Sequence, residues 1–294
     1  MKLQRLVIVG VGLIGGSLAL ALKQAGAVAE VVGVGRSQAN LAEALRLGVI
    51  DRAASLEEAV PGADVVLLAT PVAQMESLLR QMAPLLSGNT VITDGGSTKQ
   101  DVIAAALAAI PEHLPRFVPA HPIAGAEKSG ASAASAALYQ QRQVVLTPLP
   151  QTGVEAVNAV ETMWQQTGAQ VRQMSPQQHD AIFATVSHLP HLLAYALVSE
   201  VASRDNAAEL FDFAASGFRD FTRIASSSPE MWRDIALANR TALLTELQAY
   251  QRKLAQLEAL LEKADGNGLC ELFSEAREAR DRWLEGKPGL RERK

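Results

Sequence analysis

The chain has 294 residues, 48% of them hydrophobic and 20% charged, which is ordinary for a globular protein and enough for two domains with separate cores. A net charge of −4 and an aromatic content of 4% argue against nucleic acid as the main partner. The single cysteine, Cys270, excludes an internal disulfide, and the N-terminus lacks the features of a signal peptide. We therefore expect a cytoplasmic protein without a membrane segment.

The first 174 residues alternate short apolar runs with helical patterns. This alternation predicts an α/β fold, with a Rossmann-type, mainly parallel sheet and crossover helices. We assign residues 1–174 to a dinucleotide-binding domain. The expected strands are Leu6–Val9, Val31–Val34, Val65–Ala69, Val91–Thr93, Phe117–Pro119, Val144–Leu146 and Gln170–Gln173, and the expected helices include Ser17–Gln24, Ala39–Leu47, Met75–Leu86 and Val154–Thr167.

Strand patterns disappear after residue 174, so we predict an all-helical substrate and dimerisation domain over residues 175–294. Ser175-Pro176 and Ser228-Pro229 are each typical of an N-cap followed by proline at the first helical position. A long apolar helix is expected over Gln177–Ala202, with a kink at Pro190 because proline has no N–H. A later helix carries an apolar seam that suits either an internal core or a subunit contact. The seam consists of Leu243, Leu247, Tyr250, Leu254, Leu257 and Leu261.

The segment Gly10-Val11-Gly12-Leu13-Ile14-Gly15 follows the first expected strand and opens a helix. That context is what a dinucleotide-binding loop requires. Gly10 permits the tight turn, Gly12 lets the backbone approach a pyrophosphate, and Gly15 allows the helix to pack closely on the strand. Leu13 and Ile14 stand at the helix N-terminus, where free N–H groups attract phosphate. The loop therefore predicts a nicotinamide cofactor.

The end of the second expected strand bears on which cofactor binds. NAD-binding proteins usually have Asp or Glu there, whereas this chain has Gly35-Arg36-Ser37. Arg36 with Ser37 could hold a 2′-phosphate, which favours NADP, while a solvated arginine beside NAD is the alternative. Thr70 and Pro71 end another expected strand and are predicted to border the cofactor crevice.

Two segments of the first domain carry candidate catalytic residues. Ser97 lies in Asp94-Gly95-Gly96-Ser97-Thr98-Lys99, where it or Thr98 could equally cap the next helix. His121 is expected on a loop after a strand, before Pro122, and an imidazole is the natural proton acceptor at neutral pH. We predict a functional role for His121.

Two segments of the helical domain carry candidate binding residues. In Ser187-His188-Leu189-Pro190-His191 no carboxylate completes a metal motif, so we expect no metal and a structural or solvated His191. Gly217–Ala225 supplies Arg219 and Arg223, which could bind an anionic substrate or form surface ion pairs.

Taken together, these segments resemble the prephenate/arogenate dehydrogenase family of tyrosine biosynthesis. The resemblance extends over nearly the whole chain, and the ordered set of later motifs is more specific than the glycine loop. Its segments are Val9–Ala19, Ala69–Pro71, Asp94–Lys99, His121–Gly125, Ser187–His191, Gly217–Ala225 and Pro229–Asp234.

The resemblance implies NAD(P)-dependent oxidative decarboxylation of prephenate to 4-hydroxyphenylpyruvate, of arogenate to tyrosine, or of both. It implies that His121 accepts the proton of the substrate 4-hydroxyl and that Ser97 hydrogen-bonds nearby. It assigns His188 and Arg223 to the substrate carboxylate. Trp232 would lie near the substrate entrance, and the resemblance leaves open whether a partner subunit contributes it.

Some features limit the resemblance or favour other functions. Ala126 stands where many relatives have threonine, so the choice between prephenate and arogenate transfers less readily. A two-domain hydroxyacid dehydrogenase would use a lysine early in the helical domain, but no lysine lies between Lys128 and Lys253. A non-catalytic NADP-sensing protein would not need the catalytic set. We also expect a homodimer formed through the helical domain.

Overall fold

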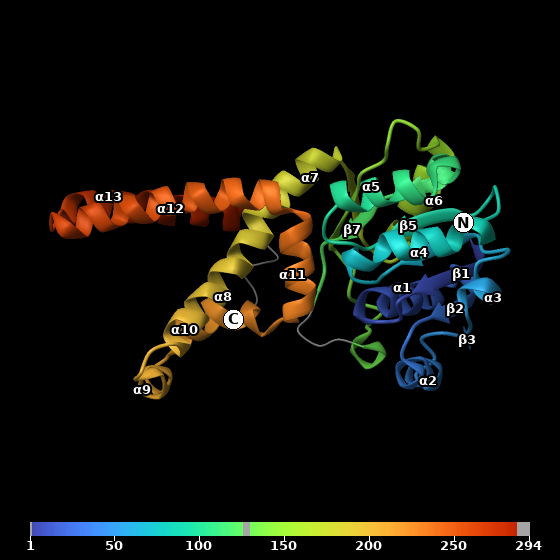
Figure 1. The fold of residues 1–294 in the computed structure, drawn as a ribbon, viewed down its shortest axis with the longest axis horizontal. Helices are drawn as coiled ribbons and strands as arrows, with labels where there is room; N and C mark the ends of the chain where they lie inside the picture. Colours follow the sequence, from blue (N-terminus) through green and yellow to red (C-terminus); the bar gives the residue numbers. More distant parts are fainter. Residues whose placement is uncertain (1, 126–129, 287–294) are drawn as a thin grey trace. The chain divides into compact units, whose positions relative to one another are not determined.

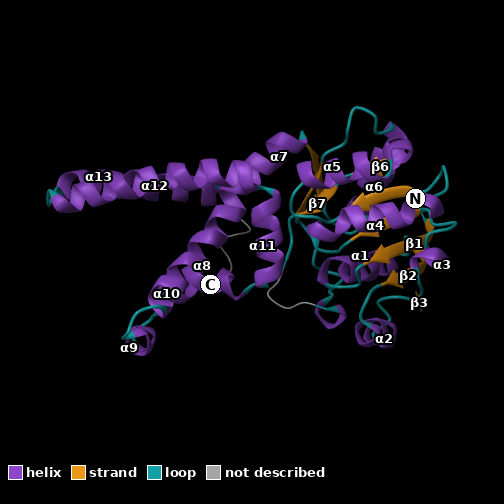
Figure 2. Cartoon of the chain, viewed as in Figure 1, coloured by secondary structure: helices purple, strands orange, loops and turns teal. Residues whose placement is uncertain are grey.

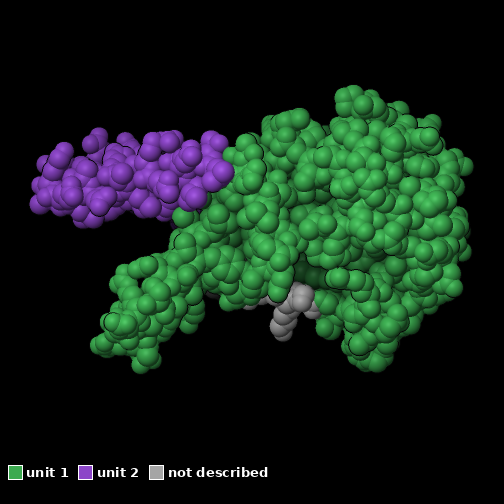
Figure 3. All heavy atoms as spheres, viewed as in Figure 1, with its two compact units in different colours: residues 1–243 green, residues 244–294 purple. Residues whose placement is uncertain are grey.

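The computed structural model describes residues 2–125 and 130–286, which form two compact units, residues 1–243 and 244–294 (Figure 3). Within the described residues, every strand lies in unit 1 (Figure 2). Strands are interspersed with helices up to β9, which ends at Gln173, and as far as residue 286 only helices follow it in the sequence. The division between the units lies inside a helix and does not coincide with the boundary predicted after residue 174. That boundary stays a prediction.

Six strands of unit 1 form a parallel sheet in the order β3-β2-β1-β4-β5-β6, which confirms the predicted Rossmann-type fold. Figure 1 labels β1, β2, β3 and β5 of this sheet among the helices of unit 1. Strand β1 pairs with both β2 and β4, so the strand order reverses beside β1. In open α/β sheets, ligands bind outside the carboxyl ends of the strands at this point. The strands are Leu3–Val9 (β1), Val28–Val34 (β2), Arg52–Ala53 (β3), Val65–Leu68 (β4), Val91–Asp94 (β5) and Phe117–Val118 (β6).

Helices cover both faces of this sheet because alternate strand residues point to opposite sides. Leu6 and Ile8 of β1 join the core formed with α1, α2 and α6, whereas Val7 and Val9 join the core formed with α3, α4 and α5. The helices are Leu13–Gln24 (α1), Gln38–Arg46 (α2), Leu56–Ala59 (α3), Met75–Met82 (α4), Gln100–Ala109 (α5) and Val154–Gln165 (α6).

A second, three-stranded sheet has the order β7-β8-β9, with Ala120–Pro122 (β7) antiparallel to Gln143–Leu146 (β8) and Gln170–Gln173 (β9) parallel to it. The strand predicted over Phe117–Pro119 is present as β6, but the loop predicted after it was wrong, because the chain forms β7 there. Pro119 has no N–H for a sheet ladder, so the chain leaves β6 and changes sheets at this residue. His121 consequently lies within a strand, held on both sides.

The helical part of unit 1 begins with Pro176–Phe183 (α7), a π-helical turn over Ala184–His188, and Leu189–Ala202 (α8). The π turn interrupts the helix as predicted from Pro190, which cannot donate to the carbonyl of Val186. Ser175 and Ser228 both cap helices, accepting from the N–H groups of Gln178 and Met231. The remaining helices are Ala207–Asp212 (α9), Ser216–Thr222 (α10), Pro229–Ala238 (α11), Arg240–Glu262 (α12) and, in unit 2, Gly266–Glu285 (α13).

The stretch Pro176–Ala202 is the one described segment that is long and apolar enough, by length and composition alone, to cross a membrane. Its mean hydropathy is 1.5, although the same values occur in core helices of proteins that do not enter membranes. Only 28% of its apolar window is buried inside the structure, and Val186 and Leu197 are exposed. A substantial apolar face is therefore left for another surface to cover.

Candidate active site

The glycine loop is built so that two glycines serve the fold and one leaves room for a ligand. Gly10 has φ +98°, and a Cβ there would lie 2.5 Å from the carbonyl oxygen of Ala69. A Cβ on Gly15 would lie 2.5 Å from Cγ2 of Ile8. By contrast, a Cβ on Gly12 would meet nothing within 4 Å. The space over Gly12 is open in a way that suits the close approach of a phosphate to the backbone.

The N-terminus of α1 complements this opening electrostatically. Helix α1 begins at Leu13, its N-cap Gly12 makes no side-chain cap, and its first turn, which includes Ile14, has no acidic residue. The N–H groups and the positive end of the helix dipole are therefore available to an anion. The hydroxyl of Thr70, beside Pro71 at the end of β4, is buried without a hydrogen-bond partner. These residues fit the pyrophosphate of a dinucleotide.

Arg36 and Ser37 follow directly after β2, at the same edge of the sheet. The Ser37 hydroxyl accepts from the N–H of Asn40 at 3.2 Å and so caps α2, while its own proton stays free to donate. Arg36 is exposed, and no hydrogen bond or ion pair to its guanidinium occurs within the described residues. An unconstrained arginine beside a capping serine can accommodate a phosphate.

His121 of β7 is joined to two residues of α7 in a chain of hydrogen bonds. Its Nδ1 lies 2.9 Å from Nε2 of His179, and Nδ1 of His179 lies 2.8 Å from Oδ1 of Asp180. Phe183 packs against both imidazoles, with ring centroids 4.9 Å from His121 and 4.5 Å from His179. The sequence singled out His121 but missed its partners, whose only local signal was an adjacent His-Asp pair near a helix start.

Asp180 also caps the helix that follows the Ser97 loop. Its two carboxylate oxygens accept from the backbone N–H groups of Lys99 and Gln100, each at 2.9 Å. Neither Ser97 nor Thr98 caps α5, so that alternative is wrong, and Ser97 is half-buried between β5 and α5. Burial alone would raise the pKa of Asp180, but hydrogen bonds from His179 and these N–H groups outweigh it and lower the pKa.

A buried ion pair fixes the start of β7. Lys99 and Asp94 contact each other with both side chains fully buried. The Lys99 ammonium also donates to the carbonyl of Ala120 at 2.7 Å, and Asp94 accepts from the Ala120 N–H at 3.0 Å. Both backbone groups of the residue before His121 are thereby held. The sequence placed Lys99 and Asp94 in a motif but gave no sign that they pair.

The environment of His121 keeps its imidazole neutral. Burial lowers the pKa of His121 well below 6.5, and repulsion from positive charge on His179, Lys99 or His188 would lower it further; of these three, only Lys99 is charged at neutral pH. A neutral imidazole is able to accept a proton; that His121 does so in the reaction stays a prediction.

A second group of side chains surrounds His188 at the end of the π turn. The amide nitrogen of Asn239 lies 3.1 Å from Nδ1 of His188; because an amide N–H can only donate, Nδ1 is the acceptor and Nε2 carries the proton. Nε2 is buried without a partner, as is Nε1 of Trp232. Burial lowers the pKa of His188 to about 4, so His188 offers an N–H at neutral pH and not a positive charge.

Trp232 of α11 links this group to His191 and Arg223. Its ring stacks on His191 with centroids 3.5 Å apart and meets His188 edge-on at 6.0 Å. The pKa of His191 is lowered mainly by burial and in part by the charge of Arg223, which places Arg223 close by. Helix α11 packs against the turn Val72–Gln74 that follows the β4 end. His191, expected to be structural or solvated, therefore belongs to the same group of side chains.

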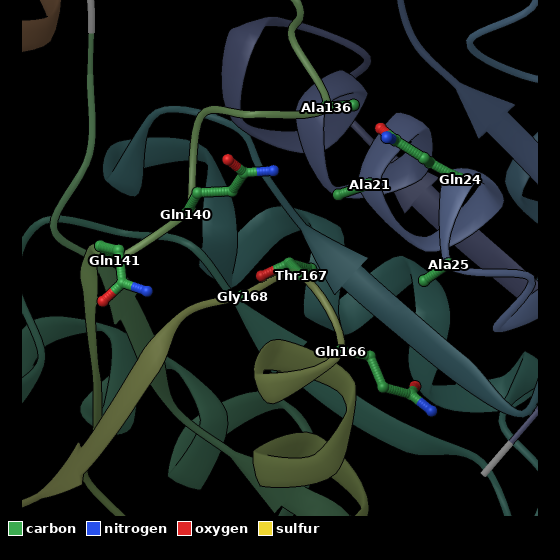
Figure 4. A pocket seen from close by; sticks show the side chains of 9 residues that line it. All are labelled: Ala21, Gln24, Ala25, Ala136, Gln140, Gln141, Gln166, Thr167 and Gly168. Carbon is green, nitrogen blue, oxygen red and sulfur yellow. The ribbon is translucent and has the colours of Figure 1, made fainter.

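One pocket of about 470 Å³ lies elsewhere, between the end of α1 and the turns around residues 140 and 167 (Figure 4). Its lining is wholly uncharged and contains no residue predicted for the site. With no titratable group it is not a place for acid–base catalysis. The lining residues are Ala21, Gln24, Ala25, Ala136, Gln140, Gln141, Gln166, Thr167 and Gly168. Ala126, where the sequence departs from many relatives, lies outside the described residues.

Comparisons with known proteins agree on one family. The family model for the prephenate dehydrogenase nucleotide-binding domain matches residues 18–173, and the model for the prephenate dehydrogenase dimerization domain matches residues 175–275. Prephenate dehydrogenase of Bacillus subtilis is 39% identical over 94% of this chain and 75% of its own length. Cyclohexadienyl dehydrogenase of Zymomonas mobilis is 37% identical over 94% of this chain and 95% of its own length.

A solved structure is similar along nearly the whole chain. The prephenate dehydrogenase of A. aeolicus, in complex with hydroxyphenyl propionate and NAD+, superposes with a TM-score of 0.90 and 34% identity. The match covers 96% of this chain and 99% of that one. The same two-part architecture is therefore present in a dehydrogenase that binds a nicotinamide cofactor.

Proposed function

The chain belongs to the prephenate dehydrogenase family and is an oxidoreductase, and from that premise we propose that it catalyses the oxidative decarboxylation of prephenate, arogenate or both. The observation that carries the proposal is the neutral His121 beside the cofactor edge of the sheet, with one ring nitrogen bonded to His179 and the other without a partner among the described residues. We also propose that the reaction takes place in the cytoplasm.

The proposed chemistry uses His121 for two proton transfers, one at the start and one at the end of the reaction. A bound nicotinamide supplies the acceptor for the hydride that leaves C4 of the ring. As that carbon gains carbonyl character, His121 takes the proton of the 4-hydroxyl. Cleavage of the bond to the ring carboxylate then releases CO2, and its electron pair makes the ring aromatic. The oxygen left at C4 recovers the proton from His121, so the enzyme ends in its starting state.

The side chains around Trp232 include a positive charge and an N–H donor, both of which can bind a substrate carboxylate. Arg223 brings a permanent positive charge to this group, and His188 supplies a neutral N–H donor from a buried position. Stacking on His191 holds the Trp232 ring in place. We propose that Arg223 and His188 bind carboxylate, with Trp232 beside them. Ser97 is proposed to hydrogen-bond to the 4-hydroxyl near His121.

Steady-state kinetics with both substrates crossed against both cofactors tests the proposal. Purified protein should reduce NADP or NAD when given prephenate or arogenate, and CO2 should form in equal amount. No reduced cofactor in any of the four combinations would contradict the proposed activity. The ratio of kcat/KM between the two substrates would also decide the side-chain preference.

We propose that NADP is preferred over NAD, since β2 ends without a carboxylate and Arg36 is unconstrained. Arg36→Ala should raise the KM for NADP about tenfold or more, the scale of one charge-assisted contact. The KM for NAD should change little. Arg46→Ala, which removes an exposed arginine of α2 that pairs with Glu43, is the matched control. Equal effects of Arg36→Ala on both cofactors would argue against a 2′-phosphate contact.

We propose that the protein is a homodimer. The dimerization-domain match and the exposed apolar face of α7 and α8 both support this. Sedimentation velocity at micromolar protein should give the mass of two chains. Placing a charge on the face, as in Leu197→Glu, should shift the sample toward monomer, whereas an unchanged dimer would exclude this face from the contact.

A further inference from the structure

A series of hydrogen bonds joins His121 to His179 and His179 to Asp180, and the proposed reaction assigns no role to the last two residues. We propose that His179 and Asp180 are positioning residues that hold a proton on Nδ1 of His121, so that Nε2 is the nitrogen that accepts the substrate proton. This inference rests on the proposed function for its catalytic meaning, but the tautomer itself is a property of the protein alone.

The direction of the chain follows from its last member. Asp180 already accepts hydrogen bonds from the N–H groups of Lys99 and Gln100, and these bonds hold its carboxyl in the charged form. A carboxylate can only accept, so Nδ1 of His179, at 2.8 Å, must be the donor.

The next hydrogen bond is then fixed as well. With its proton on Nδ1, neutral His179 has a lone pair on Nε2. Nε2 lies 2.9 Å from Nδ1 of His121, and two lone pairs cannot face each other at that distance, so Nδ1 of His121 carries the proton. Neutral His121 then has its lone pair on Nε2. No hydrogen bond to this nitrogen occurs within the described residues.

The elements that carry these residues leave little freedom to rearrange. Asp180 is tied to the N-terminus of α5, His179 is fully buried, and Phe183 packs against both imidazoles. The carbonyl of Asp180 also accepts from the side chain of Asn239, whose amide serves His188. Asp180 thus connects the Ser97 loop and the imidazole of His179 through its carboxylate, and the Asn239–His188 pair through its backbone carbonyl.

The arrangement also offsets the charge that His121 gains during the reaction. The titratable and charged groups that face the ring come from three parts of the fold. The charged groups are Asp94 at the end of β5, Lys99 before α5 and Asp180 on α7, and the neutral imidazoles are His179 on α7 and His188 at the π turn. Lys99 opposes protonation of His121, whereas the Asp180 charge, acting through His179, favours it. An apolar residue in place of His179 would break that connection while leaving Nε2 of His121 free to face the substrate.

Nitrogen NMR of protein labelled with 15N-histidine reads the tautomer directly, without cofactor or substrate. At pH 8, Nε2 of His121 should give the shift of an unprotonated nitrogen and Nδ1 that of a protonated one. The signals of His121 and His113 are identified as those that disappear in His121→Gln and His113→Gln. A wild-type spectrum with the proton on Nε2 of His121 would overturn the proposal.

Two substitutions of His179 separate positioning from structure. His179→Leu removes the acceptor, so His121 should become a mixture of tautomers and kcat should fall about 100-fold, at the lower end for general-base loss. KM should change less than about threefold. His179→Gln can accept from His121 with its carbonyl and donate to Asp180 with its amide, so it should recover the tautomer and most of kcat. His113→Gln, outside the site, should match wild type in both measurements.

Thermal unfolding of each variant shows that it is folded. If His179→Leu is folded and keeps the wild-type tautomer and kcat, the positioning role is wrong. If His179→Gln is as impaired as His179→Leu, hydrogen bonding through residue 179 is not what matters, and the proposal also fails. If wild type shows the expected tautomer but turns over neither substrate, the proposed function fails and the tautomer stands.

Discussion

Replacing His121 by asparagine is expected to lower kcat by about two to four orders of magnitude, the usual scale for loss of a general base. The carboxamide nitrogen of Asn can donate to His179 as Nδ1 of His121 does, so β7 and the buried network should keep their places. The lost feature is the second ring nitrogen, to which the proposed mechanism assigns the proton of the substrate 4-hydroxyl. Stopped-flow or steady-state measurement of reduced cofactor, at saturating substrate, gives the change in kcat.

Comparing the pH dependence of the wild type with that of His121→Asn tests whether His121 is the proton acceptor. Only neutral His121 can accept a proton, so wild-type kcat/KM should fall as the pH drops through its pKa. Because burial lowers the pKa of His121 well below 6.5, activity should persist at a pH where a solvated histidine would already be protonated. The residual activity of His121→Asn should lack this acid limb. A variant with a near-normal rate, or with the wild-type limb intact, would remove His121 from the role.

Local signals in the sequence predicted much of the framework correctly. The glycine loop, the caps at Ser175 and Ser228 and the interruption before Pro190 each depend on residues only a few positions apart. Periodic apolar runs located most of the strands of the main sheet. Strand β7 was missed because three residues flanked by a loop carry no periodicity, and its existence depends on pairing with β8.

The chemistry around the candidate base was much less accessible to sequence reasoning. The bond between His121 and His179 joins residues 58 positions apart, and the cap that Asp180 places on α5 spans 80. No helical or strand period reports a contact of that kind. Lysine is also rarely fully buried, so nothing suggested that Lys99 would be a core residue. The fold brings these groups together, and only the fold reveals them.

The ion pair between Lys99 and Asp94 yields the largest expected effect on stability. Lys99→Met should lower the free energy of unfolding by about 3–5 kcal/mol, the cost of leaving a buried charge without its partner. Both side chains are fully buried, and Asp94 would retain only the N–H groups of Gly96 and Ala120. Urea unfolding followed by circular dichroism measures the change. Arg80→Met, which breaks an exposed pair with Glu76, is the control and should cost less than about 1 kcal/mol.

A double variant shows whether charge or shape causes the loss. Asp94→Asn combined with Lys99→Met removes both charges while preserving side-chain size, so part of the stability lost in Lys99→Met should return. Activity should return less completely, because neither replacement can hold the carbonyl of Ala120 as the ammonium does. If Lys99→Met costs less than about 1 kcal/mol, the pair is not a buried charge interaction. If the double variant is less stable than Lys99→Met, the specific bonds of Asp94 to Gly96 and Ala120 outweigh its charge. In either case the position of His121 would depend on those backbone contacts and not on the ion pair.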